Sequence, residues 1–173
     1  DLIPPRYANE LLNLLSKVKV APYSAMRQVF IDEVGQPPEL VFKEFETKPI
    51  ASASISQVYR ALLPDGTPVV VKIQRPVIKQ IFEMDFLLAR FFGRLASLFR
   101  IGSSFQIQDV VKEFIAWSRL ELDFREELLN SQALARHSED HPRTIIPHSY
   151  AEWSTERVLV SENMSEVFSV EKV

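Results

Sequence analysis

The chain has 173 residues, of which 46% are hydrophobic and 25% charged, a balance that suits one folded domain with its own core. The formal net charge of -3 argues against nucleic acid as the main partner, because duplex-binding domains usually present a clustered basic face. The absence of cysteine excludes disulfides, thiolate metal sites and cysteine nucleophiles. No stretch reaches the roughly 18 uncharged apolar residues of a membrane-spanning helix. The start at Asp1, without methionine or leader, suggests a piece of a longer protein.

Two helices are predicted in the first 43 residues. Apolar residues at helical spacing indicate a short helix over 6–15 and a second over 23–34. Pro22 precedes the second helix, and Gly35 is placed to cap its C-terminus. We expect residues 1–43 to form a helical extension in front of the main domain.

A β-hairpin with a lysine inside it is the central feature of the sequence. Apolar and β-branched runs at 58–63 and 69–73 flank a Pro-Asp-Gly-Thr turn signal, and a first strand is expected over 44–49. Lys72 lies in the second arm of the hairpin. Burying its ammonium group costs several kcal/mol unless an anion meets it. Lys72 therefore needs an acidic partner.

A run of small residues precedes the hairpin. Its backbone N–H groups and hydroxyls could approach a phosphate closely, and its residues follow the pattern Ala51-x-Ala53-x-x-Ser56-x-Val58. This is the spacing of the kinase G-x-G-x-x-G-x-V loop with no glycine left. Alanine restricts the backbone more than glycine does, so the loop should be stiffer.

This stretch resembles the alanine-rich loop of the UbiB-like (aarF-type) atypical kinases, a family associated with coenzyme Q and other isoprenoid lipids. The matching loop residues are Pro49, Ala51, Ala53, Ser54, Ile55, Gln57 and Val58, followed by Asp65-Gly66 and by Val69-Val70-Val71-Lys72. The segment Ile3-Pro4-Pro5-x-Tyr7-x-x-Glu10-Leu11 resembles the one that precedes the family's nucleotide lobe. The family's K-x-G-Q motif would lie just upstream and is missing from this sequence.

A long helix is predicted over 77–99, with apolar residues on one broad face. Two interpretations stay open. In the first, the helix belongs to the core and covers the sheet. In the second, Phe86, Phe91 and Leu98 on its flanks also touch a membrane or a partner helix.

A longer helix is predicted over 106–136, and it carries an acidic cluster. Asp123 and Glu127 stand four residues apart, a like-charge pair that costs a few tenths of a kcal/mol unless a cation compensates it. Lys72 is the candidate cation, because a kinase site holds its strand lysine against a helix glutamate.

The stretch Glu121-Leu122-Asp123 resembles the family's E-x-D motif, and Glu127 falls where the lysine-pairing glutamate would be. On one continuous helix Glu121 and Glu127 would lie about 120° apart and would face different partners. The alternative for Glu121 is a solvated salt bridge with Arg125.

The last part of the chain is predicted to complete the sheet. Residues 144–153 would bring in a fourth strand and 157–160 a fifth. The stretch from Val158 to Met164 resembles the strand and hinge between two kinase lobes, with Ser161 behind the adenine; the alternative is an ordinary edge strand. No metal site is expected, since His137, His141 and His148 fall in a solvated helix end and the loop after it.

The sequence thus predicts an α+β fold similar to a protein-kinase N-lobe, with a five-stranded antiparallel sheet, a long αC-type helix and extra N-terminal and inserted helices. The lobe would span 44–173. The resemblance implies a catalytic set of Lys72, Glu127, Glu121 and Asp123. It also implies an ATP-binding set of Ile50, Ala51, Ser52, Ala53, Ser54, Ile55, Ser56, Gln57, Val58, Val70, Lys72, Glu162 and Met164. Three residues depart from the family pattern: Ser52, Ser56 and Val70, which is larger than the alanine that kinases place against adenine.

The function implied is that of the ATP-binding lobe of an atypical kinase or ATPase that supports ubiquinone or related isoprenoid-lipid metabolism. The catalytic-loop aspartate and the magnesium-binding residues belong to a second lobe outside this sequence. Turnover and Mg²⁺ are therefore expected only of a longer parent, cytoplasmic or organellar and peripherally bound to membranes. The alternative is a non-catalytic pseudokinase-type module that holds a membrane surface or a quinone-lipid enzyme through helix 77–99. A plain helical scaffold ranks last, because it leaves Lys72 unexplained.

Overall fold

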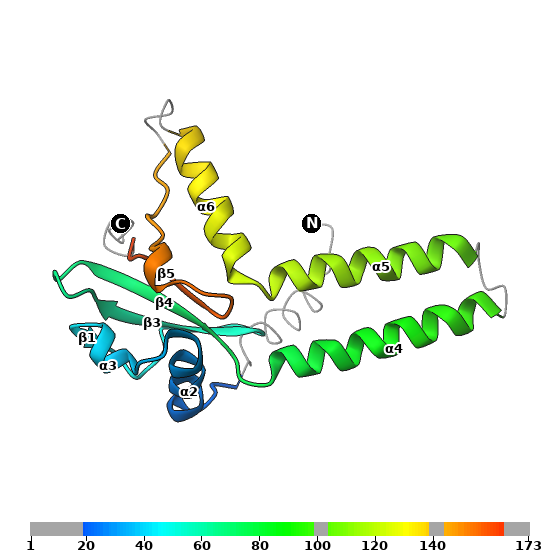
Figure 1. Ribbon diagram of the computed structural model, residues 1–173, viewed down its shortest axis with the longest axis horizontal. Coiled ribbons are helices and arrows are strands. Elements are labelled where there is room, and N and C mark those ends of the chain that lie inside the picture. Colours follow the sequence, from blue (N-terminus) through cyan, green and yellow to red (C-terminus); the bar gives the residue numbers. More distant parts are fainter. Residues whose placement is uncertain (1–18, 99–103, 139–143, 165–173) are drawn as a thin grey trace, which may run out of the picture.

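A computed structural model describes residues 19–98, 104–138 and 144–164, and it shows an α+β protein, as the sequence predicts (Figure 1). The predicted helix over 6–15 lies outside the described residues. The elements in chain order are α2 (Tyr23–Val34), α3 (Pro38–Val41), β1 (Glu44–Phe45), β2 (Ala51–Ser52), β3 (Ser56–Leu62), β4 (Pro68–Gln74), α4 (Ile78–Leu98), α5 (Ser104–Glu121), α6 (Phe124–Ser138), the 3-10 turn η1 (Ala151–Trp153) and β5 (Val158–Glu162).

In the described part of the chain, five strands form one antiparallel sheet. Strands β1, β3, β4 and β5 lie side by side in that order, and β2 pairs with the other end of β3. The strand predicted over 44–49 is therefore present only as β1, and β2 lies beyond it in the small-residue loop. The hairpin of β3 and β4 is confirmed. Its turn closes because Gly66 adopts a φ of +93° and the Asp65 carboxylate accepts a hydrogen bond from the Thr67 N–H at 2.9 Å.

One face of the sheet packs against α2, which the sequence predicted with the same bounds. Met26, Val29 and Phe30 from α2 are buried there. The strands contribute alternate residues to this core, namely Tyr59, Ala61, Val69, Val71, Ile73, Val158 and Val160. Gly35 is the predicted cap of α2; it adopts a left-handed conformation with a φ of +82° and donates its N–H to the Ile31 carbonyl at 2.8 Å.

The other face of the sheet carries Lys72. Because side chains alternate along a strand, the residues in register with Lys72 point to this same face, and they are Val58 on β3 and Leu159 on β5. Helix α6 packs here, and its Phe124 and Leu128 form a small second core with Leu159. The α2 face is thus a hydrophobic core, while the Lys72 face is only partly covered.

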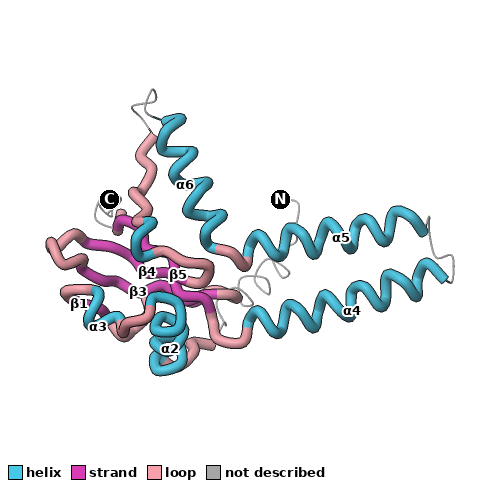
Figure 2. Tube along the Cα trace, viewed as in Figure 1, coloured by secondary structure: helices cyan, strands magenta, loops and turns pink. Residues whose placement is uncertain are grey.

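Helix α4 does not cover the sheet, so the first interpretation of residues 77–99 is wrong. It runs out from the end of β4 and packs along α5 as an antiparallel helical hairpin that projects from the sheet (Figure 2). Phe86 is buried in the hairpin, and Gly93 lies close to Val111. A broad apolar stripe on α4 remains exposed, and its residues are Ile81, Met84, Leu87, Leu88, Phe91, Phe92, Leu95 and Leu98.

The prediction of a single helix over 106–136 is also wrong, because the chain breaks between α5 and α6. Asp123 is the N-terminal cap of α6: its carboxylate accepts the Arg125 N–H at 3.0 Å, and its carbonyl accepts the Glu126 N–H at 3.1 Å. The sequence signal for this break is Asp123-x-x-Glu126, the pattern of a capping box. The continuous apolar periodicity concealed it.

The strand predicted over 144–153 is not formed. Ser149 makes one isolated bridge with Ser161, and Ala151–Trp153 is a 3-10 turn. The predicted last strand is present as β5. None of the helices in the described ranges has the length and apolar character required to cross a bilayer.

Candidate functional site

The site is built around an ion pair between strand and helix. The Lys72 Nζ lies 2.6 Å from the Glu127 Oε2, and the two side chains are 27% and 51% exposed. The Lys72 Nζ also lies 4.5 Å from the centre of the Phe124 ring, within cation–π range. Lys72 thus has the acidic partner that its place in an apolar strand requires, and the stem of its side chain stays within the sheet.

Local structure explains why Glu127 is in position. It lies in the first turn of α6, where the helix dipole favours a negative charge. A half-exposed ion pair contributes only about 0–1 kcal/mol to folding stability. The ion pair therefore adds little to the stability of the fold. Because it is half-exposed, its charged groups are accessible to a ligand.

Two residues of the predicted ATP-binding set share a face with Lys72. Val58 is directly in register with Lys72, and Val70 precedes it by two residues on β4, in register with Arg60 and Ser161. Val58 and Val70 are half-buried. The structure therefore brings the lysine and both valines onto one open face of the sheet.

The small-residue loop begins with strand β2, which pairs antiparallel with β3. Ala51 and Ser52 of β2 pair with Val58 and Gln57, and the Ala53 N–H donates to the Ser56 carbonyl at 2.9 Å. Ala51, Ala53 and Ser54 are exposed, as is Ile50 at 44%. The exposed loop can thus reach a ligand, although Ile55 is half-buried and Ser56 is buried.

Arg75 braces this loop, a role that the sequence reasoning missed. Its Nη2 donates to the Ser52 Oγ at 2.7 Å and its Nε to the Ala53 carbonyl at 2.9 Å. The Arg75 backbone N–H donates to the Ile55 carbonyl at 2.8 Å. The planar guanidinium of an arginine has several donors and can bond to two loop residues at once, whereas the ammonium of a lysine is a single compact charge.

The side chain of Gln57 faces away from Lys72. It is fully buried in the α2 core, where its Oε1 accepts the Ala21 N–H at 2.7 Å and its Nε2 donates to the Tyr59 hydroxyl at 3.0 Å. Only the backbone of Gln57 is therefore placed to serve a ligand on the Lys72 face.

Asp123 and Arg125 form a local ion pair at 2.6 Å. The hydrogen bond from Arg125 is the main reason that the pKa of Asp123 lies below its ordinary value. Arg125 reaches on to Glu156 at 3.4 Å. The predicted alternative of a Glu121–Arg125 salt bridge is not found among the described contacts.

The break between α5 and α6 brings acidic residues together that a continuous helix would have separated. A hollow of about 450 Å³ is lined by Glu121, Asp123, Glu126 and Glu127, together with Trp117, Leu120, Phe124 and Asn130. Glu121 and Glu127 therefore border one space, although among the described contacts only Glu127 pairs with Lys72. No group of metal-ligating side chains is found in the part of the chain that the structure describes.

The predicted hinge follows β5. Glu162 is in register with Val69, and its N–H donates to the His148 carbonyl at 2.8 Å. The Asn163 N–H donates to the Pro68 carbonyl at 3.1 Å. Because the Glu162 N–H is engaged, any contact between Glu162 and a base would use its carbonyl. The roles of Glu162 and Met164 stay predictions.

A sheet lysine paired with a helix glutamate is the arrangement of a kinase-like nucleotide lobe. A family model described as the ABC1 atypical kinase-like domain matches residues 13–171. The chain therefore belongs to the ABC1/UbiB family of atypical kinase-like proteins, as the loop and the E-x-D stretch indicated.

Named relatives support this assignment. The chain is 36% identical over 163 residues to "AarF domain-containing protein kinase 1" of Xenopus tropicalis, covering 94% of this chain and 31% of that protein. It is 35% identical over 168 residues to "Probable protein kinase UbiB" of Pseudomonas paraeruginosa, covering 95% and 31%. This chain thus spans about a third of the length of these relatives.

A solved structure confirms the kinase-like fold. The chain is similar to Rv3197 of Mycobacterium tuberculosis, solved in complex with erythromycin, with a TM-score of 0.73 and 33% sequence identity. The match covers 94% of this chain and 41% of that one. The likeness includes nearly all of the lobe described above.

Proposed function

We propose that this chain is the nucleotide-binding lobe of an ATP-dependent atypical kinase or ATPase. In this proposal residues 1–43 are a helical extension and residues 44–173 are the lobe. The Lys72–Glu127 pair carries the proposal, because its geometry is that of the kinase lysine that meets the phosphates of ATP and the helix glutamate that orients this lysine.

The chain's own groups would divide the work of binding. The Lys72 ammonium would meet phosphate oxygens, with Glu127 fixing its direction. Backbone N–H groups and hydroxyls of residues 51–56 would cover the phosphates, and Val58 and Val70 would flank the base. Bound ATP supplies a transferable phosphoryl group, with Mg²⁺ held by residues of a longer parent protein.

Binding of a fluorescent ATP analogue tests this proposal. The wild-type chain should bind the analogue, and Lys72→Ala should abolish the binding. Lys112→Ala is the matched control, because Lys112 is an exposed lysine that pairs with Asp109 one turn away on the same helix, α5. Absence of binding by the wild type, or equal binding by Lys72→Ala, would refute the proposal.

The metabolic role follows from the family. We infer that the parent protein supports ubiquinone or related isoprenoid-lipid synthesis, since relatives include a probable protein kinase named UbiB. Replacement of the parent gene by a Lys72→Ala allele should lower the cellular content of isoprenoid quinone to that of a deletion strain. An unchanged quinone content would contradict this role.

The exposed stripe on α4 favours a second candidate, a module that docks on a membrane surface. Exposed apolar side chains follow one side of α4 over most of its length, including Phe91 and Leu95. Arg90 and Arg94, also exposed, lie on the same helix and would complement anionic headgroups. The proposed occupant is therefore an anionic bilayer.

Flotation with vesicles of phosphatidylglycerol and phosphatidylcholine separates the two candidates. Phe91→Ser combined with Leu95→Ser should reduce vesicle binding, whereas Leu40→Ser, at an exposed leucine on α3, should not. Vesicle binding without nucleotide binding would favour the docking module alone. No vesicle binding by the wild type would reject this candidate.

A further inference from the structure

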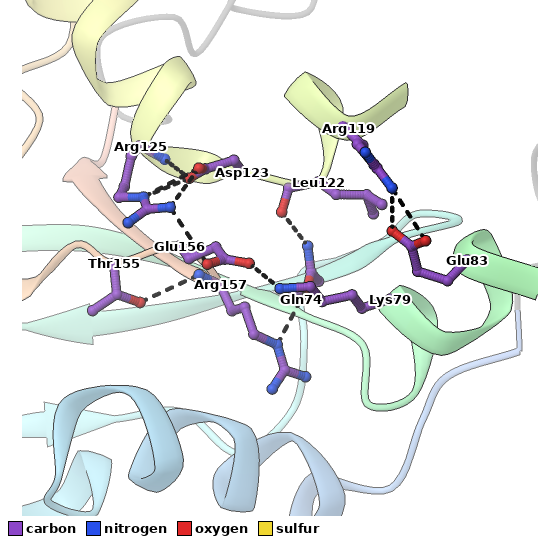
Figure 3. Close-up of polar contacts among 10 residues, drawn as sticks. All are labelled: Gln74, Lys79, Glu83, Arg119, Leu122, Asp123, Arg125, Thr155, Glu156 and Arg157. Carbon is purple, nitrogen blue, oxygen red and sulfur yellow. Dashed lines mark hydrogen bonds and ion pairs between the residues drawn. The ribbon is translucent and has the colours of Figure 1, made fainter. Parts of the chain in front are cut away.

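Gln74, the last residue of β4, is a buried polar residue on the strand of Lys72. It is 1% exposed. Its Nε2 donates to the Leu122 carbonyl at 2.9 Å, and its Oε1 accepts from the Arg157 Nε at 3.2 Å (Figure 3). Both ends of the Gln74 amide are therefore engaged, one with the joint between α5 and α6 and the other with the start of β5.

The hydrogen bond from Gln74 to the Leu122 carbonyl is important because of where Leu122 lies. Leu122 lies in the break after α5, and Asp123 then caps α6. Glu127 is in the first turns of that helix. Because Gln74 and Lys72 are two residues apart on a strand, their backbones are separated by a fixed distance of about 7 Å. One strand thus carries both the lysine and the amide that anchors the helix of its partner.

A second set of contacts holds the same helix start from Glu156, in the segment just before β5. The Phe124 N–H donates to the Glu156 carbonyl at 2.9 Å. The Glu156 carboxylate accepts from Lys79 at 2.7 Å and from Arg125 at 3.4 Å, and Figure 3 shows these side chains grouped around the joint. These ion pairs are partly exposed, whereas the Gln74 bond is buried. Gln74 is therefore a buried side-chain contact that ties the start of α6 to β4, beside the backbone bond from Phe124 to Glu156.

We propose that Gln74 is a positioning residue, which sets Glu127 and Phe124 against Lys72 through the Leu122 carbonyl. It does not touch the ligand in this proposal. Without its donor, the N-terminus of α6 would move from β4, and Glu127 and Phe124 would leave Lys72 together. The importance of this for nucleotide binding rests on the proposed function, but the geometry of the pair does not.

NMR of the chain labelled with ¹³C at lysine Cε provides a readout that needs no nucleotide. The Phe124 ring close to the Lys72 ammonium should displace the signal of the neighbouring methylene from those of exposed lysines. Gln74→Leu should return this signal toward the common lysine position. Gln74→Asn, which keeps the amide but shortens the side chain, is the milder variant and should act in the same direction.

Tyr59→Phe is the control, because it removes a buried hydroxyl that accepts a hydrogen bond on the opposite face of the sheet. It should leave the Lys72 signal in place. If either folded Gln74 variant retains the wild-type Lys72 signal, the proposal is wrong.

Nucleotide affinity supplies the second readout. Gln74→Leu should weaken binding of the fluorescent ATP analogue about five- to tenfold, as expected for loss of a buried hydrogen bond. In a Glu127→Gln background it should cause little further loss, since both changes remove the same support. Additive losses would show that Gln74 acts only on general stability. If the wild type binds no analogue, the proposed function fails while the lysine signal still tests the positioning role.

Discussion

Lys72 and Glu127 are 55 residues apart in the chain, yet their charged groups lie 2.6 Å apart across the open face of the sheet. The intervening residues form the α4–α5 hairpin and the capped joint that starts α6. The pairing depends on where that joint sits. A change at the joint should therefore affect the pair as strongly as a change in the pair itself.

Removal of the Glu127 charge should affect binding more than folding. Glu127→Gln is expected to weaken binding of an ATP analogue about tenfold, because Lys72 loses its charged orienting partner. The free energy of unfolding should change by less than about 1 kcal/mol, since the pair is half-exposed. Urea titration and analogue fluorescence measure the two quantities. Glu113→Gln, at an exposed glutamate on α5, should change neither.

Loss of the Asp123 cap should destabilise α6. Asp123→Ala is expected to lower the free energy of unfolding by about 1 kcal/mol, because the Arg125 N–H loses its acceptor. Asp123→Asn should retain much of the capping, since asparagine is also a good cap. Equal stability of the alanine variant and the wild type in urea titration would contradict the capping role.

The same carboxylate should make stability depend on pH. The pKa of Asp123 is lowered in the folded chain, chiefly by its hydrogen bond with Arg125. The unfolded chain therefore binds a proton at Asp123 more readily than the folded chain. The contribution of the Asp123 carboxylate to the free energy of unfolding is complete above the ordinary aspartate pKa of about 3.9. It is lost as the pH falls through the lower pKa of the folded chain. The difference in unfolding free energy between wild type and Asp123→Asn should shrink as the pH falls through this range.

Arg75 should control the order of the small-residue loop. Arg75→Met removes the side-chain donors to Ser52 and Ala53 and should accelerate amide hydrogen exchange in residues 52–56. Arg75→Lys should restore part of the protection, since it keeps one charged donor. Unchanged exchange rates in Arg75→Met would show that the backbone pairing of β2 is sufficient to order the loop.

Close packing of α4 and α5 should depend on Gly93. A Cβ atom at this position would lie 3.3 Å from the Val111 Cγ2, so a large side chain cannot be accommodated without separation of the helices. Gly93→Leu is expected to cost about 1–3 kcal/mol of stability, the usual range for overpacking. Ala116→Leu adds similar bulk at an exposed position of α5 and should cost much less. Thermal and urea unfolding compare the two.

The candidate site was largely accessible from the sequence, because its signals are local. A lysine in an apolar strand requires an anion, and the glycine-free loop and the acidic stretch around Asp123 pointed to a family. The hairpin turn and the α2 cap were predicted correctly for the same reason, since Gly66 and Gly35 specify left-handed backbone at fixed points.

Long-range contacts were not accessible in this way. Apolar periodicity shows that α4 buries one face but does not say against what, so the sequence alone could not distinguish the sheet from α5 as its partner. The same periodicity runs across the α5–α6 break. At this break Asp123 caps α6, and Gln74, 49 residues before Asp123 in the chain, donates to the Leu122 carbonyl.

The sequence by itself determined the hairpin, the position of Lys72 within it and the need for an acidic partner, because these follow from turn chemistry and the cost of a buried charge. Only the tertiary structure decided that Glu121 and Glu127 border one hollow and that α4 leaves its apolar stripe exposed. Both depend on the direction in which α6 and α4 leave their neighbours. That direction is set by contacts between residues far apart in the chain, such as the bond from Gln74 to Leu122.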